Sequence, residues 1–155
     1  MSVIHFSIVQ PGDAETFQRI AGWYLDEWKI PVARTIERLQ TITADPTQFQ
    51  LMMTLDGVPV ATAGLYHHVG LLDYAPHLKK YPFWLALVYT IPEQRKKGYG
   101  AMLCTRMQEY AIERGVDAIY LFTDTAEPLY KRLGWTETER IRYGERNVVV
   151  MSKQL

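Results

Sequence analysis

The residues best suited to chemistry lie in one glycine-containing segment, Ile91-Pro92-Glu93-Gln94-Arg95-Lys96-Lys97-Gly98-Tyr99-Gly100-Ala101, between a predicted strand and a predicted helix. Gly98 and Gly100 let backbone N–H groups approach a ligand closely, and the N-terminus of the helix adds partial positive charge. Three cations, residues 95–97, precede the glycines. Together these features are typical of a phosphate-binding turn. The alternative is that the glycines form only a tight turn and that the basic side chains are solvated.

Several other sites are not supported by the sequence. The dinucleotide-binding fingerprint fails because Leu103 stands where Gly or Ala is required, and no Gly-Lys-Ser/Thr follows as in a P-loop. Cys104 falls in the predicted helix, where we expect a small buried hydrophobic residue rather than a nucleophile. His67, His68 and His77 lack the spacing of known zinc motifs, so no metal site is predicted.

The segment Arg95-Lys96-Lys97-Gly98-Tyr99-Gly100 resembles the Arg/Gln-x-x-Gly-x-Gly/Ala motif of the GNAT superfamily of acyl-CoA-dependent N-acyltransferases. A second stretch resembles the family's fifth strand, fourth helix and following strand, namely Ala118–Asp124 and Pro128–Trp135. The order of the predicted elements agrees over nearly the whole chain. We therefore expect a single N-acetyltransferase domain over residues 1–155. Its expected fold is mixed α/β (α+β), with a mixed central sheet splayed between strands 4 and 5 and flanked by about four helices.

The resemblance implies that acetyl-CoA is the acyl donor and that no metal is needed. The backbone of Val88, Tyr89 and Thr90 is then expected to hydrogen-bond the pantetheine arm. Main-chain N–H groups of the glycine turn are expected to hold the pyrophosphate. The cofactor-binding residues predicted there are Arg95, Lys96, Lys97, Gly98, Tyr99, Gly100 and Ala101.

Two catalytic roles also follow from the resemblance. Tyr130 stands where many members of the family place a general acid, and proton donation to a departing thiolate accelerates a reaction by about 10²- to 10⁴-fold. A main-chain N–H on the fourth strand, assigned here to Val88, is expected to stabilise the oxyanion, an effect of about 10²- to 10³-fold. The alternative for Tyr130 is core packing with Leu129 and Leu133.

The amine acceptor must lose a proton before it attacks, yet the predicted fourth strand, residues 83–90, contains no acidic side chain. Candidate bases elsewhere are Asp26, Glu27, His67, His68 and Asp73. By family analogy the first two helices and the loop before the fourth strand wall the acceptor pocket, which singles out Trp23, Tyr24, Glu27, Trp28, Asp73 and Tyr74. We assign substrate binding to Glu27, Trp28 and Asp73, because carboxylates beside aromatic rings suit an ammonium group. The alternative is a core stripe, since Tyr24, Leu25 and Trp28 recur at helical spacing.

The elements that must position these residues are predicted from periodicity and turn signals. Strands are expected at residues 3–9, 48–55, 58–66, 83–90 and 118–123, with a final hairpin formed by 135–142 and 147–151. Helices are expected from Asp13 or Thr16 to about residue 28, and at 32–43, 98–114 and 125–133. Asp56-Gly57 is a strong hairpin signal between two of the strands. Residues 67–82 show no usable periodicity and are expected to form a long functional loop.

Composition limits the class of function. The 155 residues, 48% of them hydrophobic, are enough for one domain with a full core. The 17 basic and 17 acidic side chains cancel, which argues against a dedicated nucleic-acid binder. Residues 1–77 carry 4 basic and 8 acidic side chains and residues 78–155 carry 13 and 9, so the second half favours an anionic ligand.

The cellular setting is predicted from what the sequence does not contain. A single cysteine forms no internal disulfide, the first residues do not match a secretory signal, and the longest apolar run, residues 83–89, is too short to span a membrane. We expect a cytoplasmic protein without nucleic-acid or membrane partners. Strand edges and the final hairpin could support a homodimer.

The main hypothesis is an N-acetyltransferase that moves an acetyl group from acetyl-CoA to a primary amine of a small molecule or peptide. The amine attacks directly, without a covalent enzyme intermediate. The alternative is a catalytically inactive acyl-CoA-binding regulatory module. A third hypothesis, a small nucleic-acid-binding domain that uses residues 95–97 with Tyr99, predicts steep salt dependence of binding. The sequence does not identify the acceptor.

Overall fold

A computed structural model describes residues 2–155 and contains a mixed α/β arrangement of seven strands and five α-helices. In chain order, the elements are β1 (Ile4–Ile8), α1 (Ala14–Trp28), α2 (Val32–Thr43), β2 (Phe49–Leu55), β3 (Val58–Tyr66), α3 (Leu71–Tyr74), the 3-10 helix η1 (Pro76–Lys80), β4 (Trp84–Thr90), the 3-10 helix η2 (Pro92–Gln94), α4 (Tyr99–Glu113), β5 (Ala118–Thr123), α5 (Glu127–Arg132), β6 (Thr136–Tyr143) and β7 (Arg146–Gln154).

The strands form a sheet in the order β1-β2-β3-β4-β5-β7-β6. Most neighbours are antiparallel, as in β1 with β2 and β5 with β7, but β4 pairs with β5 in parallel through Trp84 and Tyr120. The N–H of Tyr120 also donates to the carbonyl of Phe83 at 2.9 Å. The predicted fold class, a mixed α/β fold with a mixed central sheet, is confirmed, and residues 2–155 contain five α-helices where about four were expected.

The chain divides into two compact units. The first extends to Leu65 and includes Leu87–Met107, so it contains β1, α1, α2, β2, nearly all of β3, the last part of β4, η2 and the first part of α4. The second contains Tyr66–Ala86 and Gln108–Leu155. The division falls within β4, immediately before Leu87, whose φ of 54° is unusual for a residue with a side chain.

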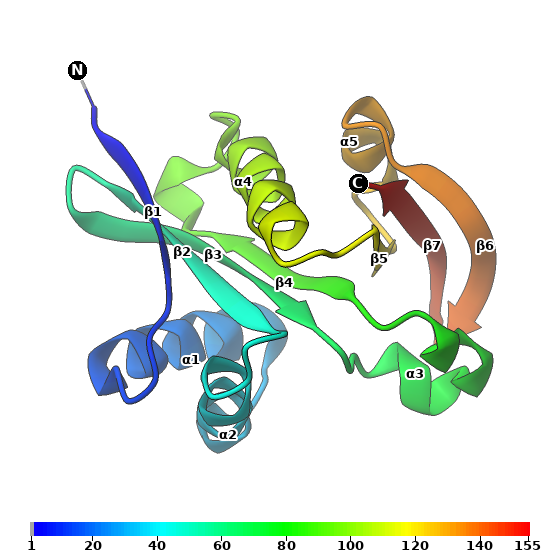
Figure 1. Ribbon diagram of the computed structural model, residues 1–155, viewed down its shortest axis with the longest axis horizontal. Coiled ribbons are helices and arrows are strands. Elements are labelled where there is room, and N and C mark those ends of the chain that lie inside the picture. Colours follow the sequence, from blue (N-terminus) through cyan, green and yellow to red (C-terminus); the bar gives the residue numbers. More distant parts are fainter. Residues whose placement is uncertain (1) are drawn as a thin grey trace. The chain divides into compact units, whose positions relative to one another are not determined.

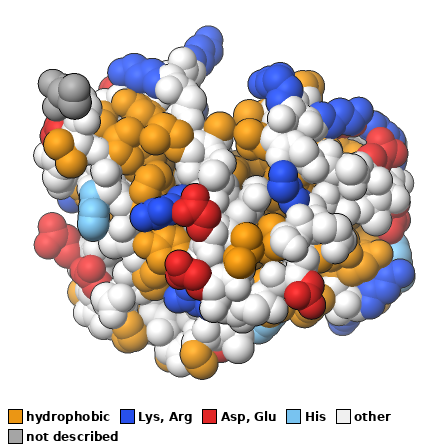
Figure 2. Space-filling view, turned by 45° about the horizontal axis from the view of Figure 1, so that its top comes forward, with side chains coloured by type: hydrophobic (Ala, Val, Ile, Leu, Met, Phe, Trp, Pro, Cys, Tyr) orange, Lys and Arg blue, Asp and Glu red, His pale blue; other side chains and the backbone are white. Residues whose placement is uncertain are grey.

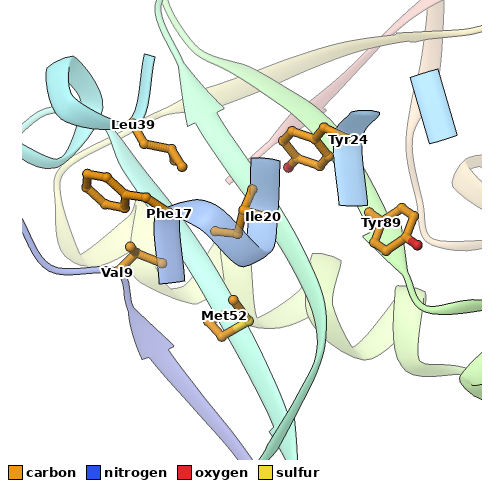
Figure 3. Packing of buried hydrophobic residues seen from close by; sticks show 7 residues of the cluster. All are labelled: Val9, Phe17, Ile20, Tyr24, Leu39, Met52 and Tyr89. Carbon is orange, nitrogen blue, oxygen red and sulfur yellow. The ribbon is translucent and has the colours of Figure 1, made fainter. Parts of the chain in front are cut away.

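In the first unit, helices α1 and α2 lie on one face of β1–β3, and the start of α4 lies on the other (Figure 1). This follows from alternation along β2, where successive side chains point to opposite faces. Met52 packs in a buried cluster with residues of α1 and α2, whereas Met53 lies opposite Phe6 of β1, whose ring contacts Arg106 of α4. The buried residues of the α1–α2 side are Val9, Phe17, Ile20, Tyr24, Leu39, Met52 and Tyr89 (Figure 3).

The ends of α1 are set by local sequence signals. The Asp13 side chain accepts a hydrogen bond from the N–H of Thr16 at 3.2 Å, which satisfies one of the free donors of the first turn. At the other end Lys29 adopts the left-handed conformation, and its N–H bonds back to the carbonyl of Leu25. The helix therefore ends before Pro31. These contacts fix the length of α1 and hence the positions of Tyr24, Glu27 and Trp28.

In the second unit, β5, β7 and β6 pair side by side. Aromatic rings cover part of these strands: Tyr81 stacks on Tyr120 with ring centres 3.8 Å apart, and Trp84 contacts both Tyr120 and Phe122. The segment 67–82, predicted as a loop without regular structure, contains the short helices α3 and η1. That prediction was wrong. Helices α3 and η1 are too short for their buried residues, Leu71, Leu72 and Leu78, to give a periodic pattern in the sequence.

The surface reflects the balanced composition of the chain. Figure 2 shows acidic and basic side chains mixed over the visible face, with hydrophobic side chains between them. Across residues 2–155, no helix is both long and apolar enough to cross a membrane.

Candidate active site

The glycine turn lies in the first unit, between the end of β4 and the start of α4. After η2 the backbone is extended at Arg95, and it adopts positive φ at Lys96 (63°) and Gly98 (84°). Helix α4 begins at Tyr99, and the N–H of Met102 already bonds to the carbonyl of Gly98 at 3.1 Å. The turn therefore leads directly into a 15-residue helix, and the first N–H groups of that helix have no partners within it. Such an N-terminus attracts anions.

The two glycines of this turn have different structural requirements. The backbone conformation requires a glycine at position 98, because a φ of 84° disfavours any residue with a side chain. Gly100 does not have a positive φ, and a Cβ added there would meet no heavy atom of the protein within 4 Å. The fold alone therefore does not require a glycine at position 100. The open space over its backbone is what a closely approaching phosphate needs.

The side chain of Arg95 points back to the protein. Its Nε donates to the carbonyl of Thr90 at 2.7 Å, its Nη2 pairs with a carboxylate oxygen of Glu27 at 3.1 Å, and its guanidinium lies 5.3 Å from the ring centre of Tyr89. Arg95 thus connects the glycine turn to the end of β4 and to α1. Arg95, Lys96 and Lys97 are all exposed, and the ammonium of Lys97 donates to Oε1 of Gln94 at 2.9 Å.

The end of β4, residues 87–90, is also fixed by α1. The hydroxyl of Tyr24 donates to the carbonyl of Leu87 at 2.8 Å. Tyr89 is 6% exposed, and burial raises the pKa of its phenol despite the nearby Arg95. Val88 and Thr90 are half-buried. The backbone segment to which donor binding was assigned is therefore well anchored in the first unit.

The structure brings together most of the aromatic residues predicted on α1. Trp23 stacks on Tyr89 with ring centres 5.4 Å apart, and Trp28 contacts the rings of Tyr24 and Tyr89 at 5.4 and 6.1 Å. Tyr24 is buried, as the core-stripe alternative predicts, whereas Trp28 is 42% exposed. Glu27 is exposed and paired with Arg95. In the first unit, then, Glu27 and Trp28 adjoin the strand segment and turn assigned to the donor.

The other predicted acceptor residue, Asp73, lies on α3 in the second unit. It is exposed, and its Oδ1 lies 2.9 Å from Nε2 of His68. This hydrogen bond lowers the pKa of the Asp73 carboxyl. Tyr74 is exposed and contacts the ring of Tyr143, and His67 bonds to the carbonyl of Pro82 at 2.6 Å.

Tyr130 lies on α5, also in the second unit. It is 8% exposed, and its ring meets Trp135 edge-on with ring centres 5.9 Å apart. The N–H of Trp135 donates to the carbonyl of Tyr130 at 3.0 Å, which joins the end of α5 to the following strand. Among the described residues, the buried Nε1 of Trp135 has no hydrogen-bond partner. Buried donors of this kind are usually satisfied by an ordered water or a ligand.

Three features of the first unit were not predicted from the sequence: the burial of Gln50, the burial of Thr62 and the contacts of the Arg95 side chain. Gln50 and Thr62 are fully buried polar residues in β2 and β3, and Gln50 bonds to both Tyr24 and Thr62. A glutamine within the apolar run of β2 was a visible signal of such a network. The role of the Arg95 side chain had no such signal, because its partner Glu27 is 68 residues away.

Cys104 is buried, as predicted. Over residues 2–155, no group of three or more His, Cys, Asp or Glu side chains is arranged to hold a metal ion.

Comparison with known proteins adds to this geometry. The sequence model of the acetyltransferase (GNAT) family matches residues 15–135. No curated protein matches the chain. Among solved structures, an aminoglycoside 6′-N-acetyltransferase complexed with coenzyme A has a TM-score of 0.75 and 14% identity, with 97% of this chain and 96% of that chain covered.

Two further structures show the same fold. The aminoglycoside 6′-N-acetyltransferase from Enterococcus faecium has a TM-score of 0.75 and 14% identity, with 97% of this chain and 96% of that chain covered. A GNAT-family acetyltransferase from Streptococcus pneumoniae has a TM-score of 0.73 and 15% identity, with 99% of each chain covered.

Proposed function

Because the chain belongs to the acetyltransferase (GNAT) family, we propose that it transfers an acetyl group from acetyl-CoA to a primary amine of a small molecule or peptide by direct attack. The observation that carries this proposal is the glycine turn at the N-terminus of α4. There the space above Gly100 is open, and the fold does not account for the glycine. A solved structure of the same fold contains coenzyme A, whose pyrophosphate is the kind of anion that such a turn holds.

In this proposal the donor is bound mainly by backbone. Main-chain N–H groups of residues 95–101 would hold the pyrophosphate, and Lys96 and Lys97 would add charge attraction. The backbone of Val88, Tyr89 and Thr90 would hydrogen-bond the pantetheine arm. Arg95 contributes by anchoring the turn to Thr90 and Glu27.

The chemistry requires no covalent enzyme intermediate. The amine nitrogen, after losing a proton, forms a bond to the thioester carbon, and the bond from that carbon to sulfur breaks. The N–H of Val88 stabilises the negative charge that develops on the thioester oxygen. Tyr130, placed by the family's pattern, gives its phenolic proton to the departing sulfur. The products are an acetamide and coenzyme A.

The acceptor is proposed to be a cationic amine. Glu27 offers a carboxylate and Trp28 an exposed aromatic face, which together favour an ammonium group. Asp73, in the second unit, is proposed as a further acceptor residue on the family's pattern alone, and the hydrogen bond with His68 lowers its pKa. An acceptor of this kind arrives protonated, and the candidate bases remain Asp26, Glu27, His67, His68 and Asp73.

The decisive experiment is thermal unfolding over a concentration series of acetyl-CoA, which needs no knowledge of the acceptor. Acetyl-CoA at about a hundred times its Kd should stabilise the fold by about 2.7 kcal/mol, or about 5 to 10 °C. Gly100→Glu should abolish the shift by filling the open space and adding a negative charge. Gly22→Glu is the matched control, because Gly22 is also a helical glycine with no neighbouring atom within 4 Å of its added Cβ.

The two variants and a turnover assay decide between the alternatives. A shift that survives in Gly100→Glu, or no shift at millimolar acetyl-CoA, would contradict donor binding at this turn. A shift without release of coenzyme A on a broad panel of primary amines would instead favour the inactive acyl-CoA-binding regulator.

A further inference from the structure

A chain of buried hydrogen bonds runs from the middle of the sheet to the end of β4. Gln50 and Thr62 are fully buried, and Tyr24 is 1% exposed. The Nε2 of Gln50 donates to the hydroxyls of Thr62 at 2.8 Å and of Tyr24 at 3.1 Å. Thr62 donates its own hydrogen to the carbonyl of Leu51 at 2.7 Å, and Tyr24 donates its hydrogen to the carbonyl of Leu87 at 2.8 Å.

The direction of this chain is fixed by its chemistry. A glutamine amide nitrogen can only donate, so each hydroxyl must accept from it and direct its own hydrogen elsewhere. For Tyr24 that hydrogen is directed to the carbonyl of Leu87. Burying an amide and two hydroxyls costs free energy that an apolar core would not, and a fully satisfied network gives one defined arrangement in return.

The arrangement is imposed at an unusual point of the backbone. Leu87 has a φ of 54°, which is rare for a side-chain-bearing residue and persists only where the surroundings hold it. The carbonyl held by Tyr24 is that of Leu87 itself. The carbonyl oxygen of Leu87 and the N–H of Val88 belong to the same planar trans peptide unit and point in opposite directions. Fixing the oxygen therefore fixes the direction of the Val88 N–H.

We infer that Tyr24, oriented by Gln50, is a positioning residue that aims the Val88 N–H at the thioester oxygen and strengthens it as a donor. This inference rests on the proposed function, in which that N–H stabilises the oxyanion. The strengthening follows because a hydrogen bond to a carbonyl polarises its peptide unit and makes the N–H more acidic. Tyr24 is 1% exposed and directs its hydroxyl at the carbonyl of Leu87, so we expect it to act through the alignment of the peptide.

The test is Tyr24→Phe, which removes the hydroxyl and keeps the ring. We expect kcat to fall about tenfold or more, since a misdirected oxyanion donor loses part of the roughly 10²- to 10³-fold that a whole donor supplies. The Kd of acetyl-CoA should change less than about twofold. Ile20→Val is the matched control: it lies on the same helix and is fully buried, but it leaves the polar chain intact and should keep kcat within about twofold.

A double variant separates alignment from folding. Tyr24→Phe alone leaves the Gln50 amide without one of its acceptors, which costs stability. Adding Gln50→Met removes that orphaned donor with little change in volume, so the melting temperature should recover. If kcat stays low in the double variant, Tyr24 acts on the peptide. If the kcat of the double variant recovers together with its stability, the positioning role is wrong. The same holds if Tyr24→Phe has the same kcat as Ile20→Val. In either case the proposed acetyl transfer stands.

A second measurement keeps the inference testable if the enzyme acetylates none of the amines offered. Hydrogen exchange of the Val88 amide, followed by NMR in the free protein, should be at least about fivefold faster in Tyr24→Phe than in Ile20→Val. Equal exchange in the two variants would overturn the positioning role. Absence of turnover in the wild type would count against the proposed function only.

Discussion

Glu27 of α1 and Arg95 of the glycine turn are joined by an ion pair of 3.1 Å, although 68 residues separate them in the sequence. The same guanidinium donates to the carbonyl of Thr90 and lies over the ring of Tyr89. One arginine therefore connects the helix assigned to the acceptor with the strand and the turn assigned to the donor. The contact suggests that removing its anionic partner will affect donor binding more than folding.

Glu27→Gln should raise the Kd of acetyl-CoA by about two- to fivefold in the absence of any acceptor, because Arg95 loses its charged partner and anchors the turn less firmly. The stability change should stay below about 1 kcal/mol, since both side chains are partly exposed to solvent. Isothermal titration calorimetry and urea unfolding measure the two effects. Glu37→Gln on α2, which removes another exposed carboxylate, should alter neither. An unchanged Kd in Glu27→Gln would show that Arg95 positions the turn without this ion pair.

The two glycines of the turn should respond to alanine in opposite ways. Gly100→Ala should stabilise the protein by about 0.5–1 kcal/mol, because the added Cβ meets open space and alanine favours helix. Gly98→Ala should destabilise it by about 1–2 kcal/mol, because its φ is 84°. Chemical denaturation of both variants checks the signs. If the two variants changed the stability equally, Gly98 would not have the positive φ that distinguishes it from Gly100.

Tyr130→Phe tests the proposed general acid. Loss of the phenolic proton should lower kcat by about 10²- to 10⁴-fold while acetyl-CoA still binds. The ring and its edge contact with Trp135 remain, so the fold should persist. Initial-rate kinetics and a thermal-shift titration give the two readouts, with Tyr110→Phe as a control outside the assigned sites. Full activity in Tyr130→Phe would leave core packing as the role of this residue.

The His68–Asp73 contact predicts a pH effect with a defined sign. The hydrogen bond from His68 holds the pKa of Asp73 below its ordinary value of about 3.9. A lowered folded-state pKa stabilises the fold above the unfolded value, and this contribution is lost as the pH falls through the lowered pKa. Replacing His68 with Phe should move the Asp73 pKa upward, as measured by NMR of the carboxyl carbon. Asp124, whose pKa is lowered by Arg146, should not change.

Local signals in the sequence were enough to predict most of the fold. Asp13 caps α1 as expected, the helix at Val32–Thr43 has the predicted bounds, and Asp56-Gly57 forms the turn between β2 and β3 with positive φ at both residues. Each of these features depends on residues close together in the chain. The failure at 67–82 has the same cause, because α3 has only four residues and leaves no periodic pattern.

The candidate site was predicted less completely, since its geometry depends on contacts between distant residues. The glycine motif indicated where an anion could bind, but nothing in the sequence marks Leu87 for a positive φ. Tyr24 was singled out as part of an acceptor wall or a core stripe, and the structure adds a hydrogen bond to a residue 63 positions later. Such a contact becomes visible only when the sheet and α1 are assembled.

The placement of Tyr24 and Glu27 on the same helix, α1, has a consequence for how the protein can diversify. Both positions hold the donor side of the site in place, one through Leu87 and the other through Arg95. Leu25, Asp26 and Trp28 are exposed side chains between and beside them. Under the proposed function, substitutions at Leu25 and Asp26 can alter which amine is accepted without altering the donor strand, whereas Trp28 packs on Tyr89 of that strand. Acceptor choice and catalytic alignment can thus evolve, or be engineered, separately on a single helix.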